Sequence, residues 1–554
     1  MTQRELDVRH VAHDLPSHAA PGEVLAVRLE LENTGSETWH ASSPRGDHVG
    51  LAVHWNGTVV ANHVLPRAQV RPGERVVLFF ALEVPLAAGS QRLELKLVRY
   101  QVAVFCDRGA DWLSHVIEVG AQAPERNARL WAGLQRCDPW HYIPTRGLAH
   151  LRDGTPLPVF IERAQGCHLW DVSGRRYLDY TMGWGSVLLG YAHPEVRAAL
   201  ERASASGPTL AFPQPVEIEV AERLCEDFPG AEMVCFAKNG SDACTFAARM
   251  ARQFTGKRTI LFSGYHGWQD FWVEQVGFER TGVAPRDPAQ IFRFPFHDLD
   301  SFRALYEQHR GDLAAVFVEP SPWAGDGLGF EPDSDPLFLR TLARMAREAG
   351  ALFVVDEIVT GYRYPEKSAQ AAKGVQADLT CLGKAIASGS PLAAVVGRAD
   401  IFKSALPRAF YAATFHAEAH SLAAARASID VYRREPVAAH VWDYGTRLRA
   451  GIEALVQQLG VEAQMWGPPF RMNLRFTRSD AALVRVERTL LQQELLRAGV
   501  TTLAGGIMLP CYAHDEATLR TTLEAWGAAL QTIARAAQRG NWDELLEIPL
   551  LVDG

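Results

Sequence analysis

The stretch Ala351-Leu352-Phe353-Val354-Val355 is a continuous apolar run, and Asp356-Glu357 follows it directly. An unbroken apolar run of this length predicts a β-strand that is covered on both faces, as in a parallel sheet between helices. Ligands of such sheets bind beyond the carboxyl ends of the strands. Asp356 is therefore predicted to lie at the ligand-binding edge, although a lone acid there could also cap a helix or pair with a base.

Further β-like runs alternate with helical segments on both sides of this stretch. Residues 233–237 precede a predicted helix from 241 to about 254, and residues 313–318 precede one over 336–349. This alternation predicts an α/β fold with a large, mostly parallel sheet. From about residue 430 the chain has helical runs with strand pieces such as 472–476, which indicates a smaller α+β unit.

The first 120 residues have a different period. Apolar and charged residues alternate strictly over 27–32, and Asn56-Gly57 separates two short strand-like runs. Such signals predict an antiparallel β-sandwich with tight hairpins. Through NTGSETW (33–39) and PGERV (72–76) this region resembles immunoglobulin-like modules. The resemblance implies contact with a sugar or a protein; a packing or oligomerisation module is the alternative.

Composition excludes several classes of protein. Of 554 residues, 47% are hydrophobic and 22% are charged, as in globular proteins rather than disordered ones. The formal charge is 56 − 64 = −8 without a dense basic run, so we expect no nucleic-acid or membrane partner. The eight cysteines form no C-x-x-C pair, so we expect no metal site and no disulfide framework. The amino-terminal segment lacks an apolar signal core, which predicts a cytoplasmic protein.

Four elements carry the chemistry. Lys384 follows Asp356 by 384 − 356 = 28 residues and comes after a second apolar run; it could reach the surface or, if desolvated, act as a Schiff-base nucleophile. Gly240 and Ser241 open a helix whose amino terminus favours a phosphate. Residues 264–268 form an aromatic loop that could stack on a flat ring. A phosphate cradle, a stacking aromatic, a carboxylate and a lysine together match the requirements of pyridoxal 5′-phosphate (PLP).

From about residue 145 to 535 the chain resembles class III, fold-type I PLP-dependent aminotransferases, and within them the glutamate-1-semialdehyde aminotransferase-like branch. The motifs occur in the family's order. The matching stretches are MGWGSVLLGYAHPEV (182–196), FAKNGSDACTFAARMAR (236–252), GYHGW (264–268), VEP (318–320), VVDEIVTGYR (354–363), DLTCLGKAIASGSPL (378–392) and ATFHAEAHSLAAA (413–425).

The resemblance implies a role for each matching residue. Lys384 would carry the cofactor as an imine and move the proton at Cα, and Asp356 would pair with the pyridine nitrogen. The remaining cofactor residues would be Gly240 and Ser241 at the phosphate, Ile358 and Tyr265 on the two ring faces, His266 and Glu319 near the ring, and Thr414 at the phosphate of a partner subunit. The resemblance therefore also implies a homodimer with shared active sites.

Departures from the family pattern bear on the substrate. HAEA (416–419) replaces the usual SGNP, so His416 and Glu418 could face the substrate or only stabilise the turn, and KNGSDA (238–243) replaces NSGTEA. Trp184 is at the family's aromatic position of the substrate pocket. Arg471 and Arg363 are candidates for binding a carboxylate, and for Arg363 a structural pair with an acid is the favoured interpretation.

These observations predict a β-sandwich over 1–122, a connector and the first part of the small aminotransferase domain over 123–190, a large PLP-binding domain over 191–429, and the rest of the small domain over 430–554. We predict amino transfer between an amino donor and an aldehyde or ketone by a ping-pong mechanism, in amino-sugar, polysaccharide or secondary-metabolite synthesis. A glutamate-1-semialdehyde-type aminomutase is the alternative. A non-catalytic scaffold is a third, which the presence of Lys384 and Asp356 disfavours.

Overall fold

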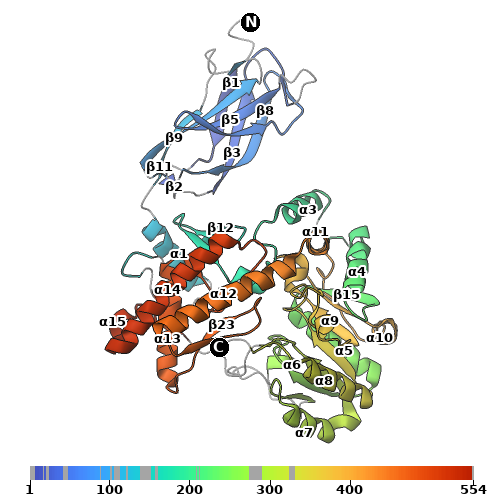
Figure 1. Ribbon diagram of the computed structural model, residues 1–554. Coiled ribbons are helices and arrows are strands. Elements are labelled where there is room, and N and C mark those ends of the chain that lie inside the picture. Colours follow the sequence, from blue (N-terminus) through green and yellow to red (C-terminus); the bar gives the residue numbers. More distant parts are fainter. Residues whose placement is uncertain are drawn as a thin grey trace. The chain divides into compact units, whose positions relative to one another are not determined.

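The computed structural model describes residues 7–15, 18–19, 24–41, 48–85, 87, 89–99, 103–104, 113–119, 123–137, 151–155, 160–207, 209–210, 212–273, 290–322 and 331–551. The chain divides into two compact units (Figure 1). Unit 1 contains residues 1–163 and 169–176, and unit 2 contains residues 164–168 and 177–554. The domain boundary at residue 122 stays a prediction.

In the described residues of unit 1, two larger β-sheets and one two-stranded sheet surround one apolar core, drawn in blue in Figure 1. The three-stranded sheet has the order β1 (Val8–His13), β3 (Val24–Asn33), β8 (Arg75–Glu83). The second sheet has the order β2 (His18–Ala19), β11 (Leu113–Val119), β9 (Gly89–Arg99), β5 (Val49–Trp55), β6 (Thr58–Val64), and β10 (Ala103–Val104) pairs with β9. β4 (Trp39–His40) pairs with β7 (Gln69–Val70). The predicted sandwich is confirmed, except that β2 and β11 pair in parallel.

The alternation in β3 decides which face enters the core. Val27, Leu29 and Leu31 are at most 1% exposed, because side chains two residues apart point to the same face. The Asn56-Gly57 turn joins β5 to β6 with Trp55 opposite Thr58. Asn56 and Gly57 have φ values of 49° and 85°, which is the combination that a two-residue hairpin turn of type I′ requires.

Unit 2 is built on a seven-stranded sheet. Its order is β15 (Met233–Ala237), β21 (Ala393–Gly397), β20 (Leu379–Leu382), β19 (Leu352–Asp356), β18 (Leu313–Val318), β16 (Thr259–Ser263), β17 (Ile291–Arg293). β16 to β20 run parallel, and β21 is antiparallel to both of its neighbours. The predicted, mostly parallel α/β sheet is therefore confirmed.

Helices cover both faces of this sheet, and β19 shows how. Val354 packs in the cluster that contains α5 (Gly240–Thr255). Phe353 and Val355 pack on the other face, with α7 (Leu299–His309) and α8 (Pro336–Glu348). All five residues of β19 are buried, as its unbroken apolar run predicted. The other helices of this region are α3 (Pro194–Ala205), α4 (Pro215–Asp227), α6 (Asp270–Val273), α9 (Ala369–Ala372), α10 (Ala399–Ala405) and α11 (Ala419–Arg434).

The rest of unit 2 joins the carboxyl-terminal segment to residues much earlier in the chain. β14 (Arg176–Asp179) pairs in parallel with β24 (Val500–Thr501), through Leu178 opposite Val500 and Asp179 opposite Thr501. α12 (Val437–Leu459), α13 (Ala481–Arg497) and α14 (Glu516–Arg539) pack with the hairpin of β22 (Ala463–Trp466) and β23 (Asn473–Phe476). Of the remaining elements, α2 (Met182–Gly185) and α15 (Trp542–Leu545) belong to unit 2 and α1 (Ala123–Cys137) belongs to unit 1, while β12 (Ile161–Gln165) and β13 (His168–Asp171) contain residues of both. None of the described helices is both long and apolar enough to span a bilayer.

Candidate functional site

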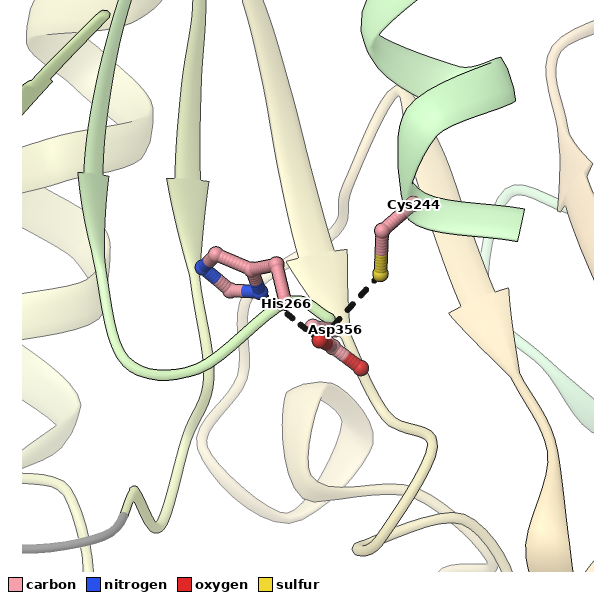
Figure 2. A group of neighbouring side chains, drawn as sticks. All are labelled: Cys244, His266 and Asp356. Atoms are coloured by element: carbon pink, nitrogen blue, oxygen red, sulfur yellow. Dashed lines mark hydrogen bonds and ion pairs between the residues drawn. The ribbon is translucent and has the colours of Figure 1, made fainter. Parts of the chain in front are cut away.

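Asp356 is the last residue of β19 and is only 2% exposed. Its Oδ2 accepts hydrogen bonds from Nδ1 of His266 at 2.7 Å and from the Sγ of Cys244 at 3.3 Å (Figure 2). Its Oδ1 accepts the backbone N–H of Ile358 at 3.0 Å. A carboxylate only accepts, so the Nδ1 of His266 must carry a proton. These contacts fix the orientation of the carboxylate at the edge of the sheet.

Aromatic rings hold His266 in place. Its ring centroid lies 5.0 Å from that of Trp272, 5.6 Å from Phe262 and 5.7 Å from Phe317. The Nε2 of His266 is buried and has no hydrogen-bond partner among the residues that the structure describes. Because three buried rings enclose the imidazole, it cannot turn away from Asp356 without disturbing the core.

Glu357, next in the chain, has a structural role instead. Its carboxylate accepts the N–H groups of Ala369 at 2.8 Å and Gln370 at 3.1 Å, and the hydroxyl of Thr360 at 3.0 Å. Burial raises the pKa of Glu357, and these donors oppose the rise. Of the two adjacent acids, Asp356 is thus the one available at the sheet edge.

Cys244, His266 and Asp356 also lie close enough together to hold a metal ion, since their ligand atoms are within 4.8 Å of one another. Metal binding needs a thiolate. Burial raises the pKa of the Cys244 thiol well above its usual value, and the nearby Asp356 carboxylate adds to the rise. A protonated Cys244 acts as the hydrogen-bond donor seen in Figure 2, so the three groups form a hydrogen-bonded cluster.

Lys384 begins a short 3₁₀ helix, two residues after β20 ends. β20 lies beside β19, with Cys381 opposite Asp356, so the lysine and the carboxylate leave the same edge of the sheet. The backbone of Lys384 is left-handed, with φ of 45°, a strained state that clusters at functional sites. Burial, followed by the charge of Arg471, lowers the pKa of Lys384 to about 8, and Asp356 acts in the opposite direction.

Glu319 and Arg471 form a buried ion pair of 2.8 Å, with side chains only 5% and 8% exposed. The other oxygen of Glu319 accepts the N–H of Tyr265 at 3.2 Å, and Arg471 also donates to the carbonyl of Ser321. Both charges of the pair act on the pKa of Lys384: Arg471 lowers it and Glu319 raises it. Two residues predicted separately, one for the cofactor and one for the substrate, are thus joined in one pair.

The predicted phosphate cradle lies at the start of α5. The Asn239 side chain caps this helix by accepting the N–H of Asp242 at 3.0 Å, so Gly240 and Ser241 are its first residues. A Cβ on Gly240 would come within 2.6 Å of Cδ1 of Ile358, so a larger residue there would have to displace the end of that side chain. The first amides of a helix have no acceptor within the helix and favour an anion.

Three further predicted residues are solvent-exposed. Tyr265 is 41% exposed and Trp184 is 55% exposed. Thr414 also lies at the surface, at the start of the turn that precedes α11. Exposure of Thr414 agrees with the expectation that it acts in another subunit, which stays a proposal.

His416 and Glu418 make local contacts. The Nδ1 of His416 lies 2.6 Å from the carbonyl oxygen of Ala413. Glu418 is the N-cap of α11, accepting the N–H of Ser421, and forms a 2.6 Å ion pair with Lys238. These contacts favour the interpretation that both residues stabilise the turn.

The partner of the Arg363 side chain differs from the acid that the sequence predicted. Arg363 forms no ion pair with an acid among the described residues; its Nη2 donates to the carbonyl of Gly185. Its Nε and Nη1 are buried without a hydrogen-bond partner in the described part of the chain. Burial lowers its pKa to about 10. The predicted acidic partner is therefore wrong, since the arginine contacts a backbone carbonyl that is distant in sequence.

Sequence reasoning missed two contributors to the site. Cys244 lies one helical turn after Gly240, so it shares the face of α5 that meets β19. That spacing was a usable signal. Lys238 had a signal too, because both Lys238 and Glu418 differ from the residues that the family motifs have at these positions. The pairing of those two departures became visible only in three dimensions.

A groove of about 800 Å³ lies elsewhere, along the carboxyl-terminal half of α5. Its lining includes Arg249, Arg252, Lys257 and Arg258 but none of the predicted site residues. The side chains of Arg249, Arg252 and Lys257 donate to backbone carbonyls, which gives these cations a structural role. The chemistry thus points to the edge of the sheet at Lys384.

Comparison with known proteins shows the family to which the chain is similar. Residues 150–465 match the model of the family described as aminotransferase class III. The chain is 30% identical over 406 residues to a 3-aminobutyryl-CoA aminotransferase of Cloacimonas acidaminovorans, covering 73% of this chain and 94% of that protein. It is 33% identical over 408 residues to a glutamate-1-semialdehyde 2,1-aminomutase of Roseiflexus castenholzii, covering 69% and 92%.

Solved structures show the same fold. The PLP internal aldimine form of the FumI protein of Sphingopyxis sp. MTA144 superposes with a TM-score of 0.68 at 27% identity, over 77% of this chain and 99% of that one. A β-phenylalanine aminotransferase of Variovorax paradoxus superposes with a TM-score of 0.64 at 28% identity, over 78% and 97%.

Proposed function

The chain belongs to the class III aminotransferases, and from that premise we propose that Lys384 and Asp356 are the catalytic residues of a PLP-dependent amino transfer. The family's chemistry moves an amino group between an amino donor and a carbonyl acceptor, with PLP as the cofactor. The observation that carries the proposal is the placement of an amine with a lowered pKa beside a buried carboxylate, at adjacent strand ends.

The residues at this edge fit the cofactor. Gly240 and Ser241 offer the first amides of α5 to its phosphate, and a Cβ on Gly240 would press on the end of the Ile358 side chain. Ile358 also lies against Gly383, where a Cβ would be 3.3 Å from its Cγ2, so its side chain borders the space beside Lys384. Asp356 is an acceptor with a fixed orientation, as a protonated ring nitrogen requires.

When bound, PLP supplies an electron sink for the bond broken at the substrate carbon. The protein's own groups then have separate tasks. The carboxylate of Asp356, oriented by His266, holds a proton at the ring nitrogen. The amine of Lys384, with a pKa of about 8, exchanges protons near neutral pH, where a general base is most effective.

Replacement of the lysine tests this assignment. Lys384→Ala should abolish turnover and the absorbance of the covalently held cofactor, while the variant still folds. Lys367→Ala is a matched control, because Lys367 forms its ion pair with Asp227 and not with site residues. Retained turnover in Lys384→Ala would refute the assignment.

An aminomutase is the second candidate, favoured by the 33% identity to a glutamate-1-semialdehyde 2,1-aminomutase. An aminomutase would convert one substrate into its isomer without an added amino acceptor. Incubation of the holoenzyme with a single amino aldehyde, followed by chromatography of the products, separates the two functions. Isomerisation without an added acceptor supports the aminomutase, and dependence on an acceptor supports the aminotransferase.

For the substrate site we propose Trp184 and Arg471, with His416 and Glu418 as supports of the neighbouring turn. Arg471 is buried beside Lys384, and a guanidinium binds a carboxylate well. A biosynthetic role in amino-sugar, polysaccharide or secondary metabolism belongs to this proposal. A screen of amino donors with and without a carboxylate would test it, since Arg471→Gln should lower the activity with carboxylate-bearing donors more than with the others.

We further propose a homodimer in which Thr414 serves the partner's active site. Mixing Lys384→Ala with Thr414→Ala chains tests this, because a mixed dimer has one site that carries both changes and one intact site. Mixed dimers should recover roughly a quarter of the wild-type activity after random subunit exchange. No recovery, although light scattering shows mixed dimers, would contradict sharing.

The sandwich has an accessory role in this proposal, as a contact for a sugar or a protein. Deleting residues 1–120 should leave a dimer that binds PLP; an aggregated product would show instead that the sandwich stabilises the enzyme. A cytoplasmic location completes the proposal. It agrees with the seven described cysteines, all of which are free thiols.

A further inference from the structure

The segment from Met182 to Gly185 is a left-handed turn. The φ values of Met182, Gly183, Trp184 and Gly185 are 42°, 56°, 57° and 78°. Left-handed backbone is unfavourable for residues that carry a Cβ, and only glycine adopts it routinely. Met182 and Trp184 are therefore strained, and a strained backbone persists only where the surroundings hold it.

The start of the turn is held by Asp179. Its carboxylate is fully buried and accepts the N–H groups of Thr181 at 2.8 Å and Met182 at 2.9 Å. The hydroxyl of Tyr191 donates to the same carboxylate at 2.8 Å. Within the turn, the hydroxyl of Ser186 donates to the carbonyl of Gly183 at 2.7 Å.

The end of the turn is held by Arg363. Its Nη2 donates to the carbonyl of Gly185, and the arginine is only 1% exposed. A buried guanidinium without a carboxylate is costly, and no other residue in the described part of the chain hydrogen-bonds its side chain. The positive charge of Arg363 also acts on Lys384, whose pKa it helps to lower. Arg363 thus links the surroundings of the catalytic amine to the turn.

Gly185 lies close to Arg363 and to Leu509. A Cβ on Gly185 would lie 3.1 Å from Leu509 and 3.3 Å from the Nη2 of Arg363. A side chain at Gly185 would therefore crowd Arg363 and Leu509, and the hydrogen bond from Arg363 holds the carbonyl of Gly185 in place. Trp184, the residue before Gly185, remains 55% exposed at the top of the turn.

We propose that Arg363 is a positioning residue for substrate selection: it holds the Gly185 carbonyl, fixes the left-handed turn, and so sets where Trp184 borders the substrate pocket. This inference rests on the proposed function, in which Trp184 lines that pocket. The substrate property selected is the size of the group attached to the amine-bearing carbon, because a fixed aromatic side chain limits the space available to it.

The test compares Arg363→Gln, Trp184→Ala and the double variant. For each, kcat and KM are measured with two amino donors that differ only in a methyl or a benzyl group. Arg363→Gln and Trp184→Ala should change the ratio of the two kcat/KM values in the same direction, by about tenfold. The double variant should show no further change, because both substitutions act through the same tryptophan.

A purely structural role for Arg363 predicts a different pattern. Loss of the Arg363 side chain would then lower both kcat/KM values equally. Alternatively, the change in the ratio in the double variant would equal the product of the changes in the two single variants. Either result overturns the proposal. A crystal structure of Arg363→Gln gives a readout independent of turnover, and it should show Trp184 displaced. If Arg363→Gln is insoluble, Arg363→Lys takes its place, because lysine keeps the charge but not the planar set of donors of the guanidinium. The ratio of the two kcat/KM values in Arg363→Lys must then change in the same direction as in Trp184→Ala.

The controls separate this inference from the proposed function. If Trp184→Ala leaves the donor ratio unchanged, Trp184 does not line the pocket, so the assignment of the substrate site fails and the inference falls with it. If Trp184→Ala changes the ratio and Arg363→Gln does not, only the inference about Arg363 fails. The absorbance of bound cofactor and the thermal midpoint verify that each variant is folded.

Discussion

Glu319→Gln removes one charge near Lys384 while keeping the shape of the side chain. Glu319 pairs with Arg471 at 2.8 Å, and both residues are buried. The carboxylate raises the pKa of Lys384, whereas the guanidinium lowers it. The substitution leaves the positive charge of Arg471 uncompensated, so we expect the pKa of Lys384 to fall below about 8. Arg471→Gln should raise it for the opposite reason.

The magnitude follows from the pKa itself. A fall from 10.5 to about 8 disfavours the ammonium form of Lys384 by ~3 kcal/mol. At pH 7 it increases the neutral fraction of the amine from about 3 in 10,000 to about 1 in 10, roughly 300-fold. A nearby charge typically changes a pKa by about 1 to 3. Each substitution should therefore displace the titration of Lys384 by about one pH unit or more.

The assay is the rate at which apoenzyme takes up PLP, followed by stopped-flow absorbance between about pH 6 and 10. Only the neutral amine attacks the aldehyde, so the rate should rise about tenfold per pH unit and level off above about pH 8. Glu319→Gln should shift the midpoint downward and Arg471→Gln upward. Glu516→Gln is the control, because Glu516 belongs to an exposed pair with Arg447. Identical midpoints in all variants, or shifts of the same sign in both, would refute the reasoning.

Three further predictions concern other parts of the chain. Lys238→Asn and Glu418→Asn each break a partly buried ion pair and should lower the free energy of unfolding in urea by about 1 to 3 kcal/mol. The double variant should regain most of that loss, because neither charge is left without its partner and asparagine at 418 can still cap α11; strictly additive losses would contradict the pairing. Gly240→Ala should weaken PLP binding about tenfold in a fluorescence titration, since its Cβ meets Ile358, and Ile358→Val should restore part of the affinity. Unchanged affinity in Gly240→Ala would show that Ile358 yields freely. Gly57 has a φ of 85°, so Gly57→Ala should destabilise the sandwich by ~1 kcal/mol in thermal unfolding. The temperature at which the absorbance of bound cofactor is lost should not change. An equal decrease in both unfolding transitions would show that the two units unfold together.

Much of the fold was predictable because its signals are local. The strict alternation over 27–32 predicted a strand with one buried face, and β3 has that face. The Asn56-Gly57 pair predicted a two-residue hairpin, and both residues have the required positive φ. The parallel pairing of β2 with β11 escaped prediction, because a two-residue strand carries no periodic signal.

The candidate site was predictable where residue type and chain order carry the chemistry. An acid after a buried strand and a lysine after its neighbour lead to Asp356 and Lys384, which leave adjacent strand ends. The environment that gives Lys384 a pKa of about 8 was not predictable, because it depends on burial and on Arg471, which lies far along the chain. Desolvation and charge proximity are properties of packing.

The sequence alone determined the two kinds of architecture, the order of the cofactor motifs and the pair of residues that we propose as catalytic, since each depends on short-range patterns. Only the tertiary structure decided which side chains contact one another in the site. It joined Lys238 to Glu418, set His266 against Asp356, and gave Arg363 a carbonyl in place of the expected acid. The physical reason is that a side chain's partner is whichever group packing brings within hydrogen-bonding distance, and spacing along the chain does not encode that distance.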